Sequence, residues 1–277
     1  MKVLVAGSRG YCGLGIVRAL LEHGHQVLGF DRSPLEAQPD SDRHEEILGD
    51  ITDLEFLFRA VEGCQAVVNS SIYRDVAGNE WKDSAHQAPI SSFVPHDLLT
   101  YQVNTAGTMN LLEAARQYGL QRAVLLSSAR VVWDHFVSRD QTVIQTDLRV
   151  TANSPLNYSD MYGFSKHLQE LVGKYYADEY GLPVIIFRPW WVVDGPENRN
   201  RYGQSLADDP IPLSPTGMVC RYDLGEACAL ALEHPEIRDD IFYPVAGPGC
   251  ERYFDVEHLH RTLGWQPRYT FQDLARS

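Results

Sequence analysis

Residues 3–13 read VLVAGSRGYCG, a short apolar run that leads directly into three glycines spaced GxxGxxG. The run Val3–Ala6 is typical of a buried strand, and Leu14–His23 carries apolar residues at helical spacing. Glycines between a strand and a helix let the backbone turn tightly and approach a phosphate, whose charge is favoured at the helix N-terminus. Three such glycines alone are a weak signal, because they also serve any tight turn.

The alternation of strands and helices continues beyond this turn. Further strands are expected over Gln26–Phe30, Ala66–Asn69, Ala123–Ser127 and Val184–Phe187, and helices over Leu54–Val61, Asn104–Tyr118, residues 162–180 and Leu224–Glu233. Strands separated by helices of this length predict an α/β fold with a doubly wound parallel sheet and right-handed crossovers. The polar segment between Asn69 and Asn104 is expected to be a loop or a short helix.

Composition narrows the function classes. The 277 residues are 44% hydrophobic and 22% charged, as in a globular protein, and the net charge of −13 disfavours nucleic-acid binding. Five scattered cysteines without a CxxC pair predict reduced thiols, a cytoplasmic protein and no metal site. The N-terminal apolar run is too short for a signal peptide, and no stretch approaches a membrane span, so we expect no membrane association.

An acidic residue follows the second strand. Asp31 lies eighteen residues beyond Gly13, where a carboxylate accepts hydrogen bonds from the ribose of a bound dinucleotide. A carboxylate there repels a 2′-phosphate, so the sequence favours NAD over NADP as the cofactor. Arg9 and Arg32 leave an alternative open, because either could hold that phosphate.

The segment Gly49–Asp53, GDITD, ends a third expected strand. We interpret Asp50 as a contact to the adenine amino group. The alternative is that Asp50 caps the helix Leu54–Val61, a role that Asp53 fits better.

The sharpest signal is the YxxxK pair formed by Tyr162 and Lys166. Residues four apart on a helix lie on one face, and a nearby ammonium lowers the pKa of a phenol. The tyrosine can then exchange a proton with a substrate hydroxyl while hydride moves to or from the cofactor. Ser128 ends a strand at the carboxyl edge of the sheet, where it either holds the reacting oxygen or caps a turn. No GxSxG is present to suggest a hydrolase.

Together these segments resemble the extended short-chain dehydrogenase/reductase superfamily, of the NAD-dependent epimerase/dehydratase type. The resemblance is carried, in order, by AGSRGYCG, GDITD, NTAGTMNLLEAA, LLSSARVV, YGFSK, FRP and LGWQPRY. It implies a Rossmann-type core over residues 1–180 and, over 181–277, the last core strands interleaved with a small substrate-binding region. It also implies a homodimer formed through two helices of each subunit.

The resemblance further implies a catalytic centre of Ser128, Tyr162 and Lys166, with Lys166 also bonding the nicotinamide ribose. Asn69, Ser70 and Ser71 would line that ribose, and Asn104 would support the lysine. The full set of expected NAD contacts is Gly7, Arg9, Gly10, Tyr11, Cys12, Gly13, Asp31, Arg32, Asp50, Ile51, Asn69, Ser70, Ser71, Asn104, Tyr162, Lys166 and Pro189.

Two departures from the superfamily bear on the substrate. Nucleotide-sugar members commonly place asparagine where this chain has Trp191, and a diphosphate-binding arginine where it has Thr216. In size the chain is closest to uronate and sugar dehydrogenases. Expected substrate contacts are Ser71, Ser128, Arg130, Trp190 and Trp191. We expect at least one of the two tryptophans to pack in the core instead. Arg130 or Arg188 would meet an anionic group of the substrate, and the alternative for Arg188 is that it pairs with a carboxylate.

Three functions follow from this pattern. The leading one is an oxidoreductase that moves a hydride from a hydroxyl of a sugar, sugar acid or similar polyol to NAD, with Tyr162 as general base. The second is a sugar or nucleotide-sugar epimerase or dehydratase that retains its cofactor. The third is a non-catalytic NAD-binding regulator, against which the intact Ser, Tyr and Lys argue.

Overall fold

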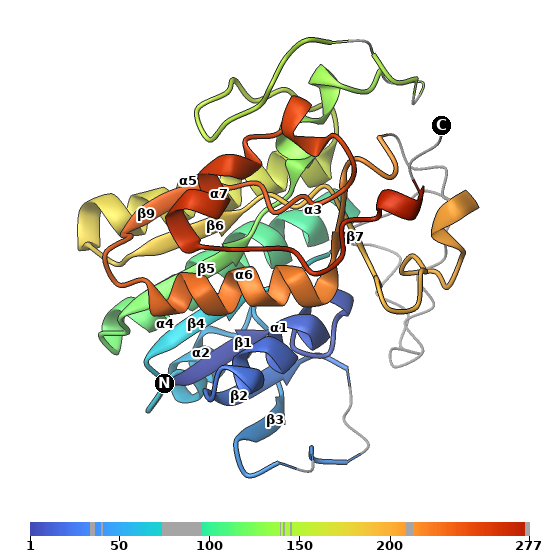
Figure 1. Cartoon of the computed structure of the whole chain (residues 1–277). Helices are drawn as coiled ribbons and strands as arrows, with labels where there is room; N and C mark the ends of the chain where they lie inside the picture. Colours follow the sequence, from blue (N-terminus) through green and yellow to red (C-terminus); the bar gives the residue numbers. More distant parts are fainter. Residues whose placement is uncertain are drawn as a thin grey trace.

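The fold is built on a seven-stranded sheet in which every neighbouring pair is parallel (Figure 1). The computed structural model describes residues 1–33, 37–39, 41–73, 96–138, 140, 142–144, 146–208 and 213–274. The strand order is β3 (His44–Leu48), β2 (Gln26–Asp31), β1 (Lys2–Ala6), β4 (Ala66–Asn69), β5 (Arg122–Leu126), β6 (Val184–Phe187) and β9 (Asp239–Phe242). The prediction of a doubly wound, Rossmann-type parallel sheet is confirmed.

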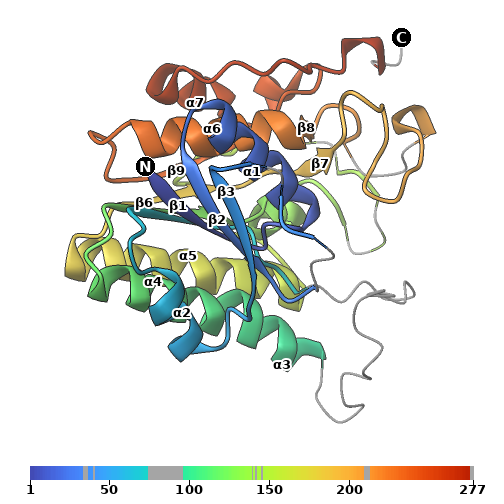
Figure 2. The same cartoon turned by 90° about the horizontal axis from the view of Figure 1, so that it is seen from below.

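Helices cover both faces of the sheet (Figure 2). One face carries α1 (Tyr11–Glu22), α6 (Arg221–Glu233) and α7 (Val256–Leu263), and the other carries α2 (Leu54–Ala60), α3 (His96–Tyr101), α4 (Gly107–Gln117) and α5 (Met161–Tyr180). Alternation along β1 divides the core between them, because Val3 and Val5 join the first layer while Leu4 and Ala6 join the second. A strand buried on both faces explains why its sequence is uniformly apolar.

Two glycines bring α1 and α6 into backbone contact. A Cβ atom on Gly15 would lie 2.1 Å from the carbonyl oxygen of Arg221, and one on Gly225 would lie 2.2 Å from the carbonyl oxygen of Gly15. Neither position therefore accepts a side chain without separating the helices. The contact places the first residue of α6 beside the glycine-rich turn that precedes α1.

The predicted elements are present, with shifts at their ends. Helix α1 begins at Tyr11 rather than Leu14, and α6 begins at Arg221 rather than Leu224. In both cases the first turn consists of polar or glycine residues that apolar spacing does not reveal. The helix expected from Asn104 is preceded by α3 and opens with a π-helical segment, Gln102–Ala106. Most of the expected loop before it, residues 74–95, lies outside the described residues.

A third apolar cluster lies beyond the carboxyl ends of the strands. It combines a 3₁₀ segment, Ala129–His135, with a small parallel sheet of β7 (Trp191–Val193) and β8 (Met218–Cys220) and with residues after β9. Short 3₁₀ segments also occur at Leu206–Asp208, Cys250–Arg252 and Gln272–Leu274. The chain enters this region after β5, again after β6 and again after β9.

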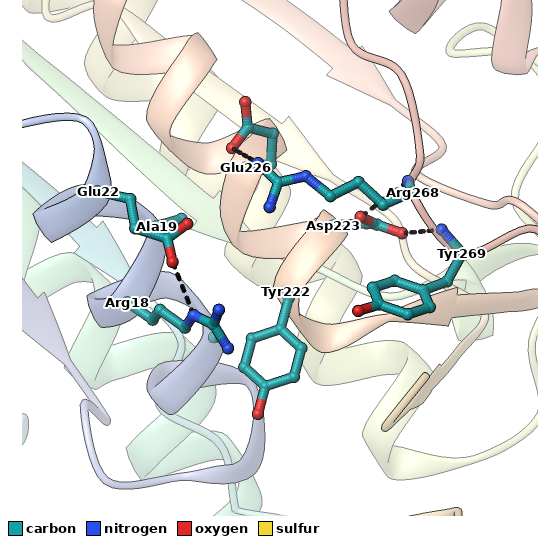
Figure 3. A pocket seen from close by; sticks show the side chains of 9 residues that line it. Arg18, Ala19, Glu22, Tyr222, Asp223, Glu226, Arg268 and Tyr269 are labelled. Carbon is teal, nitrogen blue, oxygen red and sulfur yellow. Dashed lines mark hydrogen bonds and ion pairs between the residues drawn. The ribbon is translucent and has the colours of Figure 1, made fainter. Parts of the chain in front are cut away.

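The C-terminal segment is fastened to α6 by Asp223. Its buried carboxylate accepts hydrogen bonds from the backbone N–H groups of Arg268 and Tyr269, each at 3.0 Å (Figure 3). The indole of Trp265 donates to the Asp223 carbonyl at 2.8 Å. Within the described ranges, no helix combines the length and the apolar character that crossing a bilayer requires.

Candidate active site

The glycine-rich turn is packed closely against backbone atoms. Gly7 has φ of +74°, a conformation that favours glycine, and a Cβ atom there would lie 2.9 Å from the backbone nitrogen of Ser71. A Cβ atom on Gly13 would lie 2.0 Å from the Gly7 carbonyl oxygen. Helix α1 begins after Gly10 with no side-chain cap, so its first N–H groups are left for another acceptor.

The two acids expected at the adenosine end lie at neighbouring strand ends. Asp31 is the last residue of β2, and its carboxylate accepts from the backbone of Ser33 at 3.0 Å. Asp50 follows β3 and forms an ion pair with Arg32 at 3.1 Å. Asp53, rather than Asp50, caps α2 by accepting from the backbone of Phe56, which is the division of roles that the sequence favoured.

Residues 69–71 separate into a buried amide and two serines beside the turn. The Asn69 side chain donates to the Thr108 hydroxyl at 2.9 Å and is 1% exposed, so it points into the core beneath the site rather than to its surface. The Ser70 hydroxyl donates to the Ala6 carbonyl at 2.8 Å. Ser71 lies against Gly7.

Tyr162 and Lys166 occupy the first turns of α5. Asp160 caps the helix by accepting from the Gly163 backbone at 2.7 Å. The ammonium nitrogen of Lys166 lies 6.0 Å from the centre of the Tyr162 ring, so the two side chains share one face of the helix as predicted.

Lys166 is completely buried. Its ammonium donates to the Leu126 carbonyl at 2.8 Å and to the side-chain oxygen of Gln169 at 2.9 Å. Burial lowers the pKa of Lys166 to about 7, because removal from water disfavours the charged form. Gln169 was not predicted as a site residue, although its position three residues after Lys166 places it on the same face of the helix.

Ser128 is nearly buried at the end of β5. Its hydroxyl oxygen accepts from the backbone N–H of Arg130 at 3.1 Å and so caps the 3₁₀ segment. This bond uses an acceptor site and leaves the hydroxyl hydrogen available to a substrate oxygen. The capping role and the catalytic role, posed as alternatives by the sequence, are therefore compatible.

Asn104 lies in the π-helical segment and is fully buried. Its amide exchanges hydrogen bonds with the backbone of Tyr73 and donates to the Ser165 hydroxyl at 3.0 Å. Asn104 thus contacts Ser165, the neighbour of Lys166 in the chain, and makes no hydrogen bond to the ammonium. The ammonium itself donates to Leu126 and Gln169. Isolated π-turns often occur at functional sites.

The two tryptophans after β6 have different surroundings. Trp190 stacks on Trp133 with ring centres 4.4 Å apart, and it also contacts Phe136 and Phe254, so it belongs to the third apolar cluster. Trp191 is equally buried and belongs to the same cluster, and the Arg201 guanidinium lies over its ring at 5.2 Å. The expectation that at least one tryptophan packs in the core is met by both.

The arginines proposed as substrate contacts are both paired with carboxylates, one within α5 and one at its N-cap. Arg188 forms a bidentate pair with Glu170 at 2.6 and 2.8 Å and is 2% exposed, so its guanidinium secures β6 rather than facing a substrate. Arg130 pairs with Asp160 at 2.6 Å and stacks on Trp133. Arg130 therefore stabilises the start of α5 through its ion pair with Asp160. Pro189, the last expected cofactor contact, follows β6 and accepts from the Ala129 backbone at 2.9 Å.

A cationic group that the sequence did not reveal surrounds Tyr11. The guanidinium of Arg201 lies 5.8 Å from the Tyr11 ring centre and that of Arg221 lies 5.0 Å from it. Arg221 also pairs with Asp194 at 2.6 Å. The Tyr11 hydroxyl and the Nε atoms of both arginines are buried without a hydrogen-bond partner. Buried donors without partners are costly, so an anion bound here would satisfy them.

These features fit a dinucleotide. The uncapped start of α1 and the close approach at Gly7 and Gly13 together suit a pyrophosphate. Asp31 stands at the next strand end, where a ribose hydroxyl is recognised. Among the residues that the structure describes, no group of three or more His, Cys, Asp or Glu is arranged around a metal site.

A parallel sheet of this order, with Tyr162 and Lys166 at its carboxyl edge, defines a protein of the extended short-chain dehydrogenase type. The chain belongs to the NAD-dependent epimerase/dehydratase family, whose model matches residues 3–207. The prediction of NAD as the cofactor agrees with this family.

Individual relatives cover the chain to different extents. A 3-beta-hydroxysteroid dehydrogenase of Mycolicibacterium neoaurum is 30% identical over 68% of this chain, which spans only 46% of that relative's length. The L-arabinose 1-dehydrogenase (NAD(P)(+)) of Haloferax volcanii is 25% identical over 96% of both chains. The solved structure of a mutant uronate dehydrogenase from Agrobacterium tumefaciens, complexed with NAD, has the same fold, with a TM-score of 0.70 and 20% identity over 98% of this chain and 86% of that one.

The buried ammonium predicts a pH-dependent stability. The pKa of Lys166 is about 7 in the folded chain and 10.5 when exposed, so between these values the unfolded chain binds the extra proton. Stability should therefore rise with pH across this window, by at most about 1.4 kcal/mol per pH unit. Urea unfolding of the cofactor-free protein measures this. The free energy of unfolding of the wild type, relative to that of Lys166→Met, should rise between pH 6 and pH 9.

Lys174→Met provides the matched control on the same helix, because Lys174 is exposed. Its stability difference from the wild type should stay constant over the same pH range. An equal pH dependence in the two variants would refute the assignment to Lys166.

Proposed function

We propose that this protein is an NAD-dependent oxidoreductase that oxidises a hydroxyl group of a sugar, sugar acid or similar polyol. The observation that carries this proposal is the pairing of Tyr162 with the buried Lys166 beside the glycine-rich turn. The match to a sugar dehydrogenase over nearly the full length of both chains supports the substrate class. Residues after 180 that form the third apolar cluster would serve as the substrate-binding region.

The glycine-rich turn and Asp31 would hold NAD, which would supply the acceptor for the hydride of the substrate carbon. Ser128 would donate its hydroxyl hydrogen to the reacting oxygen and fix its position. Tyr162 would remove the hydroxyl proton as general base. The ammonium of Lys166 stabilises the phenolate electrostatically, and Gln169 with the Leu126 carbonyl holds that ammonium in place.

Among the possible substrates, the cationic group around Tyr11 favours a sugar acid. Arg201 lies over the ring of Trp191 and carries a buried Nε donor without a hydrogen-bond partner. A guanidinium whose Nε donor lacks a hydrogen-bond partner can bind a carboxylate, and an indole can pack on the C–H face of a sugar ring. Arg130 and Arg188 are already paired with carboxylates, at the N-cap of α5 and within it.

An epimerase or dehydratase that retains its cofactor is the second candidate, because the family includes such enzymes. The two candidates differ in stoichiometry. A dehydrogenase forms one NADH for each substrate oxidised, whereas an epimerase shows no net reduction of added NAD. A screen of sugars, uronic acids and polyols by NADH absorbance would separate them.

Tyr162→Phe tests the proton-transfer role. The substitution keeps the ring and removes the hydroxyl, so turnover should fall by roughly two to four orders of magnitude, the usual contribution of general acid–base catalysis. NAD binding should persist. Tyr175→Phe, at an exposed position of the same helix, should keep its turnover. Near-normal turnover of Tyr162→Phe would assign the proton transfer to another group.

Arg201→Gln tests the sugar-acid substrate. Loss of one charge-assisted hydrogen bond should raise KM for a sugar acid at least about tenfold, with little change in KM for the corresponding neutral sugar. Arg199→Gln is the control, because Arg199 is exposed two residues away. A similar rise for both substrates, or for both variants, would contradict carboxylate recognition by Arg201.

We propose a homodimer that pairs α4 and α5 of each subunit. Exposed apolar side chains lie on these helices: Met109 on α4 and, on one face of α5, Phe164, Leu171 and Tyr175. Leu171→Glu should convert the dimer to a monomer in sedimentation velocity, whereas Lys174→Glu should not. A monomeric wild type would reject this arrangement. A cytoplasmic location is also proposed, since the five cysteines are separate thiols.

A further inference from the structure

A buried carboxylate lies directly beneath the glycine-rich turn. Glu46, in the middle of β3, is 3% exposed. It accepts hydrogen bonds from the Ser8 hydroxyl at 2.7 Å and from the Arg9 guanidinium at 2.8 Å, and His44 lies 2.9 Å from its other oxygen. An isolated buried carboxylate is strongly unfavourable, so this set of partners accounts for its presence.

The neighbouring strand is shaped to admit this carboxylate. Gly29 of β2 is the register partner of Glu46, and a Cβ atom on Gly29 would lie 2.0 Å from the Glu46 carboxylate oxygen. Glycine inside a strand often marks such a close approach. The side chain of Glu46 thus lies across β2 and reaches the turn that follows β1.

Arg9 is held by Glu46 at the adenosine end of the cofactor site. Its second terminal nitrogen donates to the Asp31 carbonyl at 3.1 Å and to the Ser33 carbonyl. Arg9 therefore stands at the end of β2, where an extra phosphate on the ribose of NADP would lie. A guanidinium at this place would ordinarily bind such a phosphate.

Each arginine at this strand end is paired with a carboxylate, but the two pairs differ in exposure. In the Arg9–Glu46 pair the side chains are 15% and 3% exposed, whereas in the Arg32–Asp50 pair they are 43% and 35% exposed. Exposed pairs contribute about 0–1 kcal/mol because water screens them. Buried charges interact much more strongly, so Glu46 neutralises Arg9 more fully than Asp50 neutralises Arg32.

We propose that Glu46 is a positioning residue that determines cofactor selectivity, by binding Arg9 so that the arginine does not attract the 2′-phosphate of NADP. Arg9 then orders the end of β2 through two backbone carbonyls, and Asp31 presents an unopposed negative charge to the ribose. The inference rests on the proposed cofactor site, but it is independent of the proposed substrate.

Glu46→Gln tests this proposal, because glutamine keeps the size and a hydrogen-bond acceptor but removes the charge. Calorimetric titration with NAD, NADP and 2′,5′-ADP gives binding constants without turnover. The ratio of NADP to NAD affinity should rise at least about tenfold, the gain from one charge-assisted hydrogen bond. Binding of 2′,5′-ADP should tighten by a similar factor, and NAD affinity should stay within about twofold.

Asp50→Asn, which removes the carboxylate paired with Arg32, is the matched control. Because its ion pair is exposed, the ratio of NADP to NAD affinity should change by only about twofold. An equal or larger change than in Glu46→Gln would overturn the proposal, as would an unchanged ratio in folded Glu46→Gln protein.

The double variant Glu46→Gln/Arg9→Gln identifies the group responsible and replaces the ion pair with neutral amides that are expected to fold. The proposal requires the double variant to have the same ratio of NADP to NAD affinity as the wild type, because the Arg9–Glu46 pair as a whole carries no net charge. NADP affinity below that of the wild type would mean that Arg9 already binds the phosphate, and would overturn it. Failure of the wild type to bind NAD would instead reject the cofactor site itself.

Discussion

The architecture depends on the absence of side chains along the start of α1. Gly7 meets the backbone of Ser71, Gly13 meets that of Gly7, and Gly15 meets that of Arg221. Through these three contacts the glycine-rich turn and the start of α1 meet the segment after β4 and the first turn of α6. A methyl group at any of them would displace the backbone that it meets, so the glycine-rich turn and the start of α6 are set by the same packing constraint.

A series of buried hydrogen bonds connects the end of β4 to Lys166. Asn69 donates to Thr108, Gln169 donates to the same hydroxyl, and the oxygen of Gln169 accepts from Lys166. Each member is buried, so each depends on the next for its hydrogen bonds. The position of the ammonium is thereby tied to the end of β4, although Asn69 and Lys166 are far apart in the sequence.

Local geometry made much of this predictable. Tyr162 and Lys166 are four residues apart on a helix, so their shared face follows from the sequence, and the same rule would have identified Gln169. The strands were recognisable because burial on both faces makes them uniformly apolar. The roles of Arg188 and Arg130 were not decidable in this way, since both lie near the carboxyl edge and only the fold reveals which carboxylate faces each. The cluster of Tyr11, Arg201 and Arg221 depends on the contact between α1 and α6, which no local pattern encodes.

The distribution of charge also divides the site into two ends. At the ribose end, Arg9 and Arg32 each face a carboxylate, so positive charge is cancelled beside Asp31. At the other end, Arg201 and Arg221 have buried Nε donors without a partner, as Arg9 also does, and Arg221 pairs with Asp194. In a protein of net charge −13, these buried donors are what local attraction for an anion requires. Arg9, Arg32 and Arg221 each form an ion pair with a carboxylate, whereas Arg201 forms none in the part of the chain that the structure describes.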